Sequence, residues 1–284
     1  IPGTGRAVEV ALAAVPDFDG DVLVLSGDVP LLDADTLLTL VRDHRASRAA
    51  VTLLSAVVDD PTGYGRVIRA VDGTVERIVE QKDASAAEAA VPEINAGVYV
   101  FQAAPLRAHL GRVGTANAQG EKYLTDVVAL ARADGLAVTA SVVTDVALTL
   151  GVNDRAQLAE AGRLLNARTV RRWQLEGATI QDPATTWIDV TATLAPDVTV
   201  LPNTHILRAT AVASGAVIGP DTSLEDCEVG EGATVRRTDA TLAVIGARAT
   251  VGPFAYLRPG TILAEGGKIG TFVETKNAQI GAGS

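Results

Sequence analysis

The chain has 284 residues, a length that predicts about two domains, each long enough to bury its own hydrophobic core. Hydrophobic residues make up 48% of the chain and charged residues 20%, which excludes a disordered, collagen-like or coiled-coil protein. The formal net charge of −10 argues against a sizeable nucleic-acid interface, because phosphate backbones are bound by clustered Lys and Arg, but it still allows a single nucleotide escorted by a cation.

Cysteine content and hydropathy indicate the compartment. Cys227 is the only cysteine, so no internal disulfide can form and a reducing, cytoplasmic location is expected. The apolar runs 50–54 and 56–58 are far shorter than the roughly 20 residues that a membrane helix needs. Residues 1–10 lack the unbroken apolar run of a signal peptide. Because the chain contains no methionine, we expect it to be a piece of a longer protein.

Residues 1–154 alternate between short aliphatic runs and helical patterns, which is typical of an α/β doubly wound sheet. The run 22–25 is too short for a buried helix and predicts a central parallel strand. Asp33 is a plausible N-cap for a helix over 34–44, and 50–58 predicts a second strand. The alternation recurs through 97–101, 123–133 and 138–143, and a helical stretch from Arg155 to Glu176 predicts a linker over 155–177.

Residues 178–284 carry a repeat of six residues. This period fits neither a helix nor an alternating strand, but it fits a parallel β-helix with three short faces per coil and each aliphatic side chain pointing inward. A slip of one residue between 224 and 229 and a longer gap between 235 and 245 predict either loops that leave a coil or irregular coils. The aliphatic positions are Ile188, Leu194, Val200, Ile206, Val212, Ile218, Leu224, Val229, Val235, Ile245, Val251, Leu257, Leu263 and Ile269.

Candidate ligand-binding residues follow the predicted strands. Asp28 stands after the Ser26-Gly27 corner, just past the run 22–25, and such sheets bind ligands outside the carboxyl ends of their strands. A lone carboxylate there can serve Mg²⁺ held mainly by substrate phosphates and waters, or it can simply cap a helix or turn. The glycine-rich turn 62–66 lets backbone amides approach a ligand, although an ordinary β-turn has the same pattern. The segments 80–83 and 95–97 are equally ambiguous, although polar residues next to strands can bind sugar hydroxyls, and Gly3-Thr4-Gly5 is a short glycine loop of low specificity.

The order of these segments resembles one protein family over essentially the whole chain. The segments are Gly-Thr-Gly at 3–5, Ser-Gly-Asp-Val-Pro-Leu at 26–31, Gly-Tyr-Gly-Arg at 63–66, Glu-Gln-Lys-Asp at 80–83, Asn-Ala-Gly-Val-Tyr at 95–99, Tyr-Leu-Thr-Asp at 123–126, Gly-Val-Asn at 151–153, and, within the coils, Tyr-Leu-Arg-Pro-Gly at 256–260 and Phe-Val-Glu-Thr-Lys-Asn at 272–277. This order is similar to that of the bifunctional bacterial N-acetylglucosamine-1-phosphate uridylyltransferases and glucosamine-1-phosphate acetyltransferases, the GlmU family.

The resemblance implies a partial nucleotide-sugar pyrophosphorylase domain at 1–154, a linker helix at 155–177 and a partial left-handed parallel β-helix acetyltransferase domain at 178–284. It implies synthesis of UDP-N-acetylglucosamine. Acetyl-CoA would acetylate glucosamine-1-phosphate, and UTP would then donate its uridylyl group to N-acetylglucosamine-1-phosphate. By position, Asp28 and Asn153 would hold Mg²⁺, and Arg258 and Lys276 would bind the glucosamine phosphate. The nucleotide or the sugar would contact Gly3, Thr4, Gly65, Glu80 and Asn95, to which we add Ser26 and Gly27 beside Asp28.

The family implies a homotrimer with active sites between subunits, acting on small molecules and neither on nucleic acid nor at a membrane. Its glycine-rich loop and lysine are expected before Ile1, and its general-base histidine beyond Ser284, so we expect no catalytic residue within the chain and little activity from it alone. Arg6 stands where the family has histidine. Two alternatives remain: another sugar-1-phosphate nucleotidylyltransferase with a β-helix domain, or a non-catalytic regulatory homologue.

Overall fold

The computed structural model describes residues 2–284 and divides into two compact units, the first ending at Ala161 and the second running from Gly162 to Ser284. Each unit has its own hydrophobic core. Within residues 2–284, no helix combines the length and the apolar character needed to cross a membrane.

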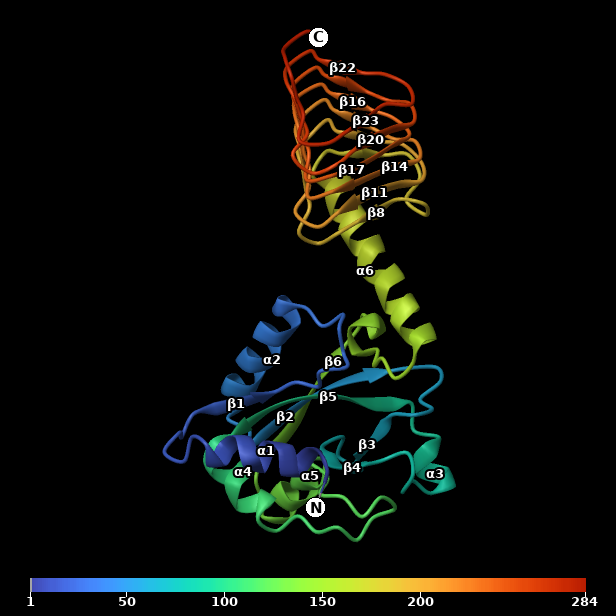
Figure 1. Cartoon of the computed structure of the whole chain (residues 1–284). Coiled ribbons are helices and arrows are strands. Elements are labelled where there is room, and N and C mark those ends of the chain that lie inside the picture. The colour runs from blue at the N-terminus through green and yellow to red at the C-terminus, as the bar shows by residue number, and fades with distance from the viewer. Residues whose placement is uncertain (1) are drawn as a thin grey trace. The chain divides into compact units, whose positions relative to one another are not determined.

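The first unit is built on a mixed sheet of six strands (Figure 1). The long strand β5 (Glu93–Gln102) pairs along one edge with β2 (Val51–Val57), which in turn pairs with β6 (Val138–Val143). The other edge of β5 is shared by β3 (Gly65–Arg69), at its first half, and β1 (Asp21–Val24), at its second half. A hairpin joins β3 to β4 (Val75–Val79), the last strand of the sheet.

The expectation of a central parallel strand at 22–25 is wrong. β1 runs antiparallel to β5, and within residues 2–161 only β2 and β6 are parallel neighbours. Leu23 in β1 is 38% exposed, so the strand is not buried on both faces. An aliphatic run of four residues indicates a strand in apolar surroundings, but it does not indicate whether the neighbouring strand is parallel or antiparallel.

Helices cover both faces of this sheet, as the α/β alternation predicts (Figure 1). On one face, α1 (Thr4–Ala13), α4 (Ala103–Leu110) and α5 (Asp126–Ala133) pack around a core that includes Phe101. On the other face lies α2 (Ala34–Ser47), whose Leu40 packs on Val98. The Asp33 carboxylate accepts the Thr36 amide hydrogen at 2.8 Å and so begins α2 as expected. The short elements α3 (Ala86–Ala89) and η1 (Val146–Thr149) and the long helix α6 (Arg155–Leu175) complete the helices.

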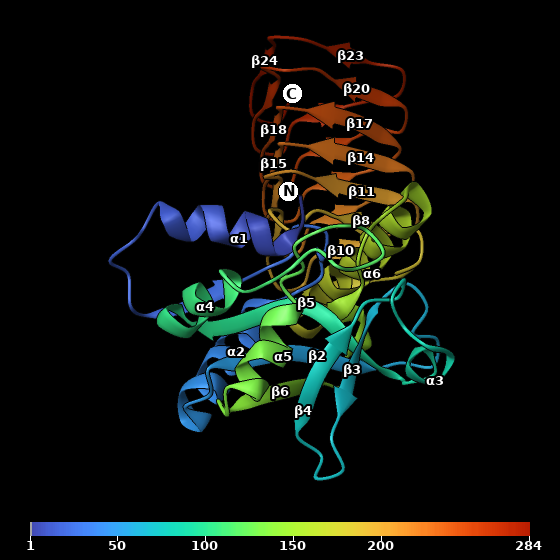
Figure 2. The same cartoon turned by 90° about the horizontal axis from the view of Figure 1, so that it is seen from below.

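The second unit contains a parallel β-helix, in agreement with the six-residue repeat. Figure 2 shows one of its three sheets as a ladder of parallel strands. The first sheet contains β7 (Thr179–Ile180), β10 (Thr199–Val200), β13 (Val217–Ile218), β16 (Thr234–Val235), β19 (Thr250–Val251) and β22 (Lys268–Ile269). The second contains β8 (Trp187–Ile188), β11 (Thr204–Leu207), β14 (Thr222–Glu225), β17 (Thr238–Thr241), β20 (Ala255–Leu257) and β23 (Glu274–Thr275). The third contains β9 (Thr193–Leu194), β12 (Ala211–Val212), β15 (Glu228–Val229), β18 (Val244–Ile245), β21 (Ile262–Leu263) and β24 (Gln279–Ile280).

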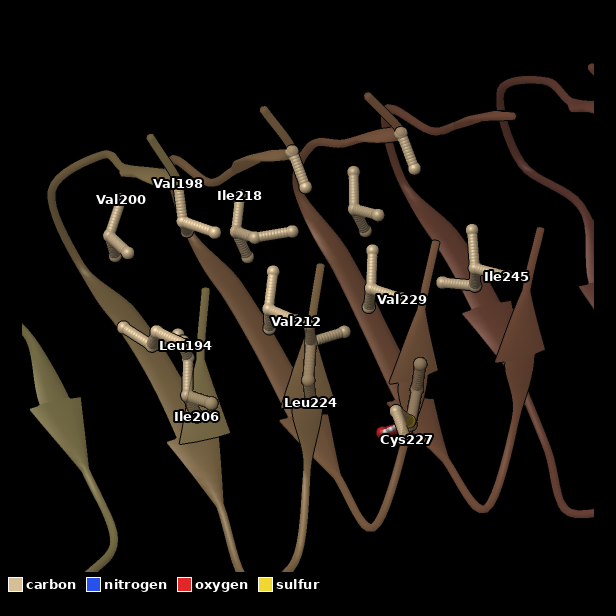
Figure 3. Packing of buried hydrophobic residues seen from close by; sticks show 14 of the residues in the cluster. Leu194, Val198, Val200, Ile206, Val212, Ile218, Leu224, Cys227, Val229 and Ile245 are labelled. Atoms are coloured by element: carbon tan, nitrogen blue, oxygen red, sulfur yellow. Dashed lines mark hydrogen bonds between the residues drawn. The ribbon is translucent and has the colours of Figure 1, made fainter. Parts of the chain in front are cut away.

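Stacked aliphatic side chains fill the β-helix. Every aliphatic position of the repeat from Ile188 to Ile269 is buried, and Figure 3 shows several of these side chains in rows that run from coil to coil across the view. Small residues occupy the interior corners, where threonine hydroxyls satisfy backbone carbonyls. Thr204 and Thr210, for example, each donate to the carbonyl three residues earlier at 2.7 Å. Cys227 is a free thiol buried in the same core.

The slip and the gap in the repeat are irregular coils, not loops. In the gap, Ala240 of β17 lies between Leu224 and Leu257 in the parallel register and is fully buried, so it occupies the place of an aliphatic residue. The steps from Val235 to Ala240 and from Ala240 to Ile245 are one residue shorter than the repeat. A search for Val, Ile and Leu at a spacing of six misses an alanine, so the repeat looks interrupted in the sequence.

Candidate functional site

The first unit contains a cavity of about 1080 Å³ bordered by α1, β1, the turn 62–65, β5 and the segment 149–157. Eight of the residues predicted to bind nucleotide, sugar or metal line it, namely Thr4, Ser26, Gly27, Asp28, Gly65, Glu80, Asn95 and Asn153. These residues come from six separate segments of the chain, so the fold gathers what the sequence spreads over 150 positions.

Gly3 is the predicted residue of this unit that does not line the cavity. It precedes α1 with a φ of 123°, and a side chain there would clash with the Lys122 carbonyl oxygen. The neighbouring Thr4 hydroxyl accepts the Leu124 amide hydrogen at 3.0 Å, and the Gly5 amide donates to the Lys122 carbonyl at 2.8 Å. The Gly-Thr-Gly segment therefore anchors the start of α1 beside the cavity, and its glycines are required by close backbone packing.

Asp28 and Asn153 are brought together by a backbone contact. The Val152 amide donates to the Asp28 carbonyl at 2.8 Å, which ties the loop after β1 to the segment before α6. The Asn153 amide donates to the Gln157 side chain at 2.6 Å, within the first turns of that helix. Both residues are exposed to the cavity, so a carboxylate and a carboxamide oxygen face one space. Such hard oxygen donors suit Mg²⁺.

Among residues 2–284, no group of three or more His, Cys, Asp or Glu side chains could hold a metal ion. A divalent cation near Asp28 would therefore take its remaining ligands from waters and from the phosphates of a substrate, which is the usual mode for Mg²⁺. The donor set fits the cation that the resemblance implies.

Glu80 also lines the cavity and is half-buried. Burial is the main cause that raises its pKa. The Thr125 hydroxyl, which donates to Glu80 at 3.0 Å, partly offsets this effect, and the carboxylates of Asp83 and Asp126 add to the rise. Gly65 pairs with Asn95 across β3 and β5, and a side chain at this glycine would lie 3.5 Å from the Glu80 carboxylate. Because Gly65 has no side chain, the space between Glu80 and Asn95 is not filled at this position.

The Asn95 carboxamide is held on both sides. Its Oδ1 accepts the Gly97 amide hydrogen at 3.2 Å, and its Nδ2 donates to the Tyr99 hydroxyl at 2.6 Å. The Gly97 carbonyl in turn accepts the Ser26 hydroxyl at 3.0 Å. Ser26 was predicted to bind substrate, and the structure shows its hydroxyl donating to the protein backbone.

Arg66 is a structural residue of the site, and the sequence motifs assign no role to it. It is only 1% exposed, and its guanidinium donates to the Tyr64 carbonyl, to the Gln81 side chain at 2.7 Å and to the Ala89 carbonyl at 3.2 Å. The same Gln81 oxygen accepts the Gly63 amide hydrogen at 3.0 Å. A buried arginine thus shapes the turn 62–65. A charged residue is rarely buried without such partners. The only feature of the sequence that could have indicated this role is the position of Arg66 directly after the glycine-rich turn.

The predicted phosphate-binding pair of the second unit lies at one corner of the β-helix. Arg258 follows β20 and Lys276 follows β23, and Leu257 pairs with Thr275 between these strands. The Arg258 amide also donates to the Thr275 carbonyl at 2.9 Å. Consecutive coils therefore place the two cations one above the other. The Arg258 guanidinium also pairs with Glu274 at 2.9 Å.

Comparison with known proteins matches this architecture. The model of a family described as nucleotidyl transferase matches residues 1–191. Among curated relatives, the chain is 64% identical over 285 residues to the bifunctional protein GlmU of Clavibacter sepedonicus and 65% identical over 285 residues to that of Leifsonia xyli. It is 55% identical over 293 residues to the bifunctional protein GlmU of Micrococcus luteus. Each alignment covers 100% of this chain but only 58 to 59% of the relative.

Proposed function

The chain belongs to the nucleotidyl transferase family, and from this premise we propose that the complete protein synthesises UDP-N-acetylglucosamine in two steps. It would first transfer an acetyl group from acetyl-CoA to glucosamine-1-phosphate, and then a uridylyl group from UTP to N-acetylglucosamine-1-phosphate. The observation that carries the proposal is the convergence of eight predicted residues on one cavity, with Asp28 and Asn153 tied together at one side of it. The names of the curated relatives support the bifunctional assignment.

In the uridylyl step, a phosphate oxygen of the sugar phosphate attacks the α-phosphorus of UTP in line with the departing pyrophosphate. The bond between the α-phosphorus and the bridging oxygen breaks, and pyrophosphate leaves with that oxygen. Asp28 and Asn153 would hold Mg²⁺, which when bound supplies positive charge that offsets the negative charge of the phosphates. Residues 1–154 would carry this activity.

On the sugar side, Asn95 and Glu80 offer groups that suit hydroxyls. A carboxamide both donates and accepts hydrogen bonds, and a carboxylate accepts them. The turn held by Arg66 and the bare backbone of Gly65 leave room for a sugar ring between these two side chains. Thr4, Ser26 and Gly27 complete the wall on the side of α1 and β1.

In residues 178–284, Arg258 and Lys276 would bind the phosphate of glucosamine-1-phosphate, since guanidinium and ammonium groups are good phosphate partners. The substrate amine would attack the thioester carbonyl of acetyl-CoA, and the thiol of CoA would leave. We propose that this part acts in a homotrimer and that the protein works in the cytoplasm, which the single free cysteine supports.

The test is pyrophosphate release by the complete protein with different substrate pairs. We expect UTP with N-acetylglucosamine-1-phosphate to be used with the highest kcat/KM among pairs that also include glucose-1-phosphate, mannose-1-phosphate and the other nucleoside triphosphates. Preference for another pair would support a different sugar-1-phosphate nucleotidylyltransferase. Absence of turnover with every pair, in protein that still binds nucleotide, would support a regulatory homologue.

A further inference from the structure

We propose that Tyr99 is a positioning residue for the sugar side of the cavity, because its hydroxyl holds the Asn95 carboxamide in one orientation. This inference rests on the proposed function and deepens it. The orientation of the Asn95 carboxamide would be fixed before the sugar binds.

The contact between Asn95 and Tyr99 is unusual because both residues belong to β5. Four residues along a regular strand span about 13 Å, so side chains at this spacing do not meet. Here β5 is irregular: Leu53 of β2 lies opposite Tyr99 and Ser55 opposite Asn95, so Leu54 alone faces residues 96–98. Gly97 in this bulge has a φ of 70°. The bulge contracts the strand and brings Nδ2 of Asn95 to 2.6 Å from the Tyr99 hydroxyl.

The contacts with Gly97 and Tyr99 fix the orientation of the Asn95 carboxamide. A backbone amide can only donate, so the atom that faces Gly97 at 3.2 Å must be Oδ1, and Nδ2 must then face Tyr99. Each end of the amide keeps one free position, a lone pair on Oδ1 and a hydrogen on Nδ2. Asn95 therefore presents one acceptor and one donor side by side, a pair that matches two neighbouring sugar hydroxyls or an acylamino group.

Tyr99 acts through Asn95 and has little surface of its own to offer a ligand. It is 3% exposed, and its ring stacks on Phe101 with the centroids 5.4 Å apart. Across the sheet it pairs with Val24, two residues before Ser26. The chain of hydrogen bonds from Ser26 through the Gly97 peptide to Asn95 ends at this rigid ring.

Loss of the hydroxyl would free one end of the carboxamide, because the terminal torsion of asparagine is broad unless its partners restrict it. The sugar would then have to order the amide when it binds. One neutral hydrogen bond contributes about 1 kcal/mol, so we expect the Tyr99→Phe variant of the complete protein to have a KM for N-acetylglucosamine-1-phosphate raised about 5- to 10-fold. The KM for UTP and the rate of acetyl transfer should stay within about twofold of the parent.

The experiment is a double-mutant cycle on the complete protein with Tyr99→Phe, Asn95→Ala and the combination, in which both KM values and kcat of pyrophosphate release are measured. If Tyr99 acts through Asn95, the Tyr99→Phe change has no further effect in the Asn95→Ala background. The matched control is Thr52→Val, which removes another buried, hydrogen-bonded hydroxyl from the same sheet, where Thr52 contacts His44 and Thr139 at 2.9 Å. This variant should leave both KM values unchanged.

Three results would overturn the inference while the sugar-binding role of Asn95 stands. These are a raised KM in Asn95→Ala with a parental KM in Tyr99→Phe, additive effects in the cycle, or an equal rise of both KM values in Tyr99→Phe. A parental sugar-phosphate KM in Asn95→Ala would instead contradict the proposed role of Asn95 itself, and the inference with it.

Discussion

Gly97 links the Ser26 and Asn95 side chains at the cavity. Its φ of 70° is in the left-handed region, and a side chain there would lie 2.6 Å from the Ser26 hydroxyl oxygen. Its amide and its carbonyl are both used, one by Asn95 and the other by Ser26. The residue therefore meets two separate requirements, a backbone conformation and a close approach.

We expect Gly97→Ala to lower uridylyl transfer strongly, because the new methyl group must displace the Ser26 hydroxyl from the Gly97 carbonyl, two residues before Asp28, and the alanine strains the backbone that positions Asn95. The matched control is Gly73→Ala. Gly73 has a φ of 81°, but it lies in the exposed β3–β4 hairpin turn with open space around it. Both variants should lose about 1 to 2 kcal/mol of stability from the strained backbone. Steady-state kinetics should show a large loss of kcat/KM only for Gly97→Ala, and equal activity in the two variants would contradict this account.

Glu80 is a carboxylate whose environment disfavours its charge. Burial raises its pKa above the ordinary value of 4.5. At a pH between 4.5 and the raised pKa, the folded chain therefore binds more protons than the unfolded chain. The free energy of unfolding therefore falls as the pH rises through this window, and the loss remains at neutral pH. This is a local cost of keeping a carboxylate at the cavity.

The Glu80→Gln variant should consequently be more stable than the parent at neutral pH, with a smaller fall in stability above pH 4.5. Glu88→Gln is the control of opposite sign. The Ser85 hydroxyl and amide and the Arg77 guanidinium lower the pKa of Glu88 to about 2, so this carboxylate stabilises the fold above 4.5 and loses its effect as the pH falls. The stability of both variants can be followed by hydrogen exchange of the β5 amides, measured from acidic to neutral pH. Slower exchange in Glu88→Gln at neutral pH would contradict the assignment.

At the scale of elements, each coil of the β-helix depends on its neighbours above and below. The side chains stack directly, so the room at any position is decided by the length of its own coil and by the residues next to it. The coil of β17 has two corners shortened by one residue each, and the fully buried Ala240 fills its interior between Leu224 and Leu257. We infer that the two shortened corners leave this coil room for an alanine side chain only.

Restoring the aliphatic pattern with Ala240→Leu should therefore destabilise the protein by about 1 to 3 kcal/mol, since the added atoms overpack the coil. Thr241→Leu, on the same strand but half-exposed, should change stability by less than about 0.5 kcal/mol. Tryptophan fluorescence, which comes from Trp173 in the β-helix core and Trp187 in β8, can follow urea unfolding of both variants. A gain in stability for Ala240→Leu would mean that the coil has room for the larger side chain.

At the scale of the whole molecule, the residues assigned to the two proposed reactions fall in different units. The predicted uridylyl residues lie before Ala161, and Arg258 and Lys276 lie after Gly162. Each unit encloses its own core, so a change to a surface side chain in one need not disturb the fold of the other.

In the complete protein, Asp28→Asn should lower the rate of pyrophosphate release by at least about 100-fold, because charge stabilisation by a held cation contributes several kcal/mol. Acetyl transfer by the same variant should stay within about twofold of the parent. Arg258→Ala is the reciprocal control and should weaken only acetyl transfer, with a raised KM for glucosamine-1-phosphate. Loss of both activities in either variant would contradict the division of labour.

The sequence by itself was sufficient for the fold class of both units, although not for the direction of every strand in the sheet. A period of six residues has only one common structural solution, and the alternation of aliphatic runs with capped helices such as the one after Asp33 predicts helices on both faces of a sheet. The resemblance of its short motifs to those of one family also supplied eight of the residues that line the cavity. The architecture depends on local periodicity and spacing, which the sequence displays directly, whereas the site residues were available only through that resemblance.

Tertiary structure alone decided how those residues meet. The antiparallel pairing of β1 with β5, the bond from Val152 to Asp28, and the bulge that joins Asn95 to Tyr99 all depend on which segments lie side by side. Spacing along the chain would place Asn95 and Tyr99 about 13 Å apart in a regular strand. Their actual contact is set by the pairing of β5 with β2 and by the left-handed backbone of Gly97, which are properties of the folded sheet.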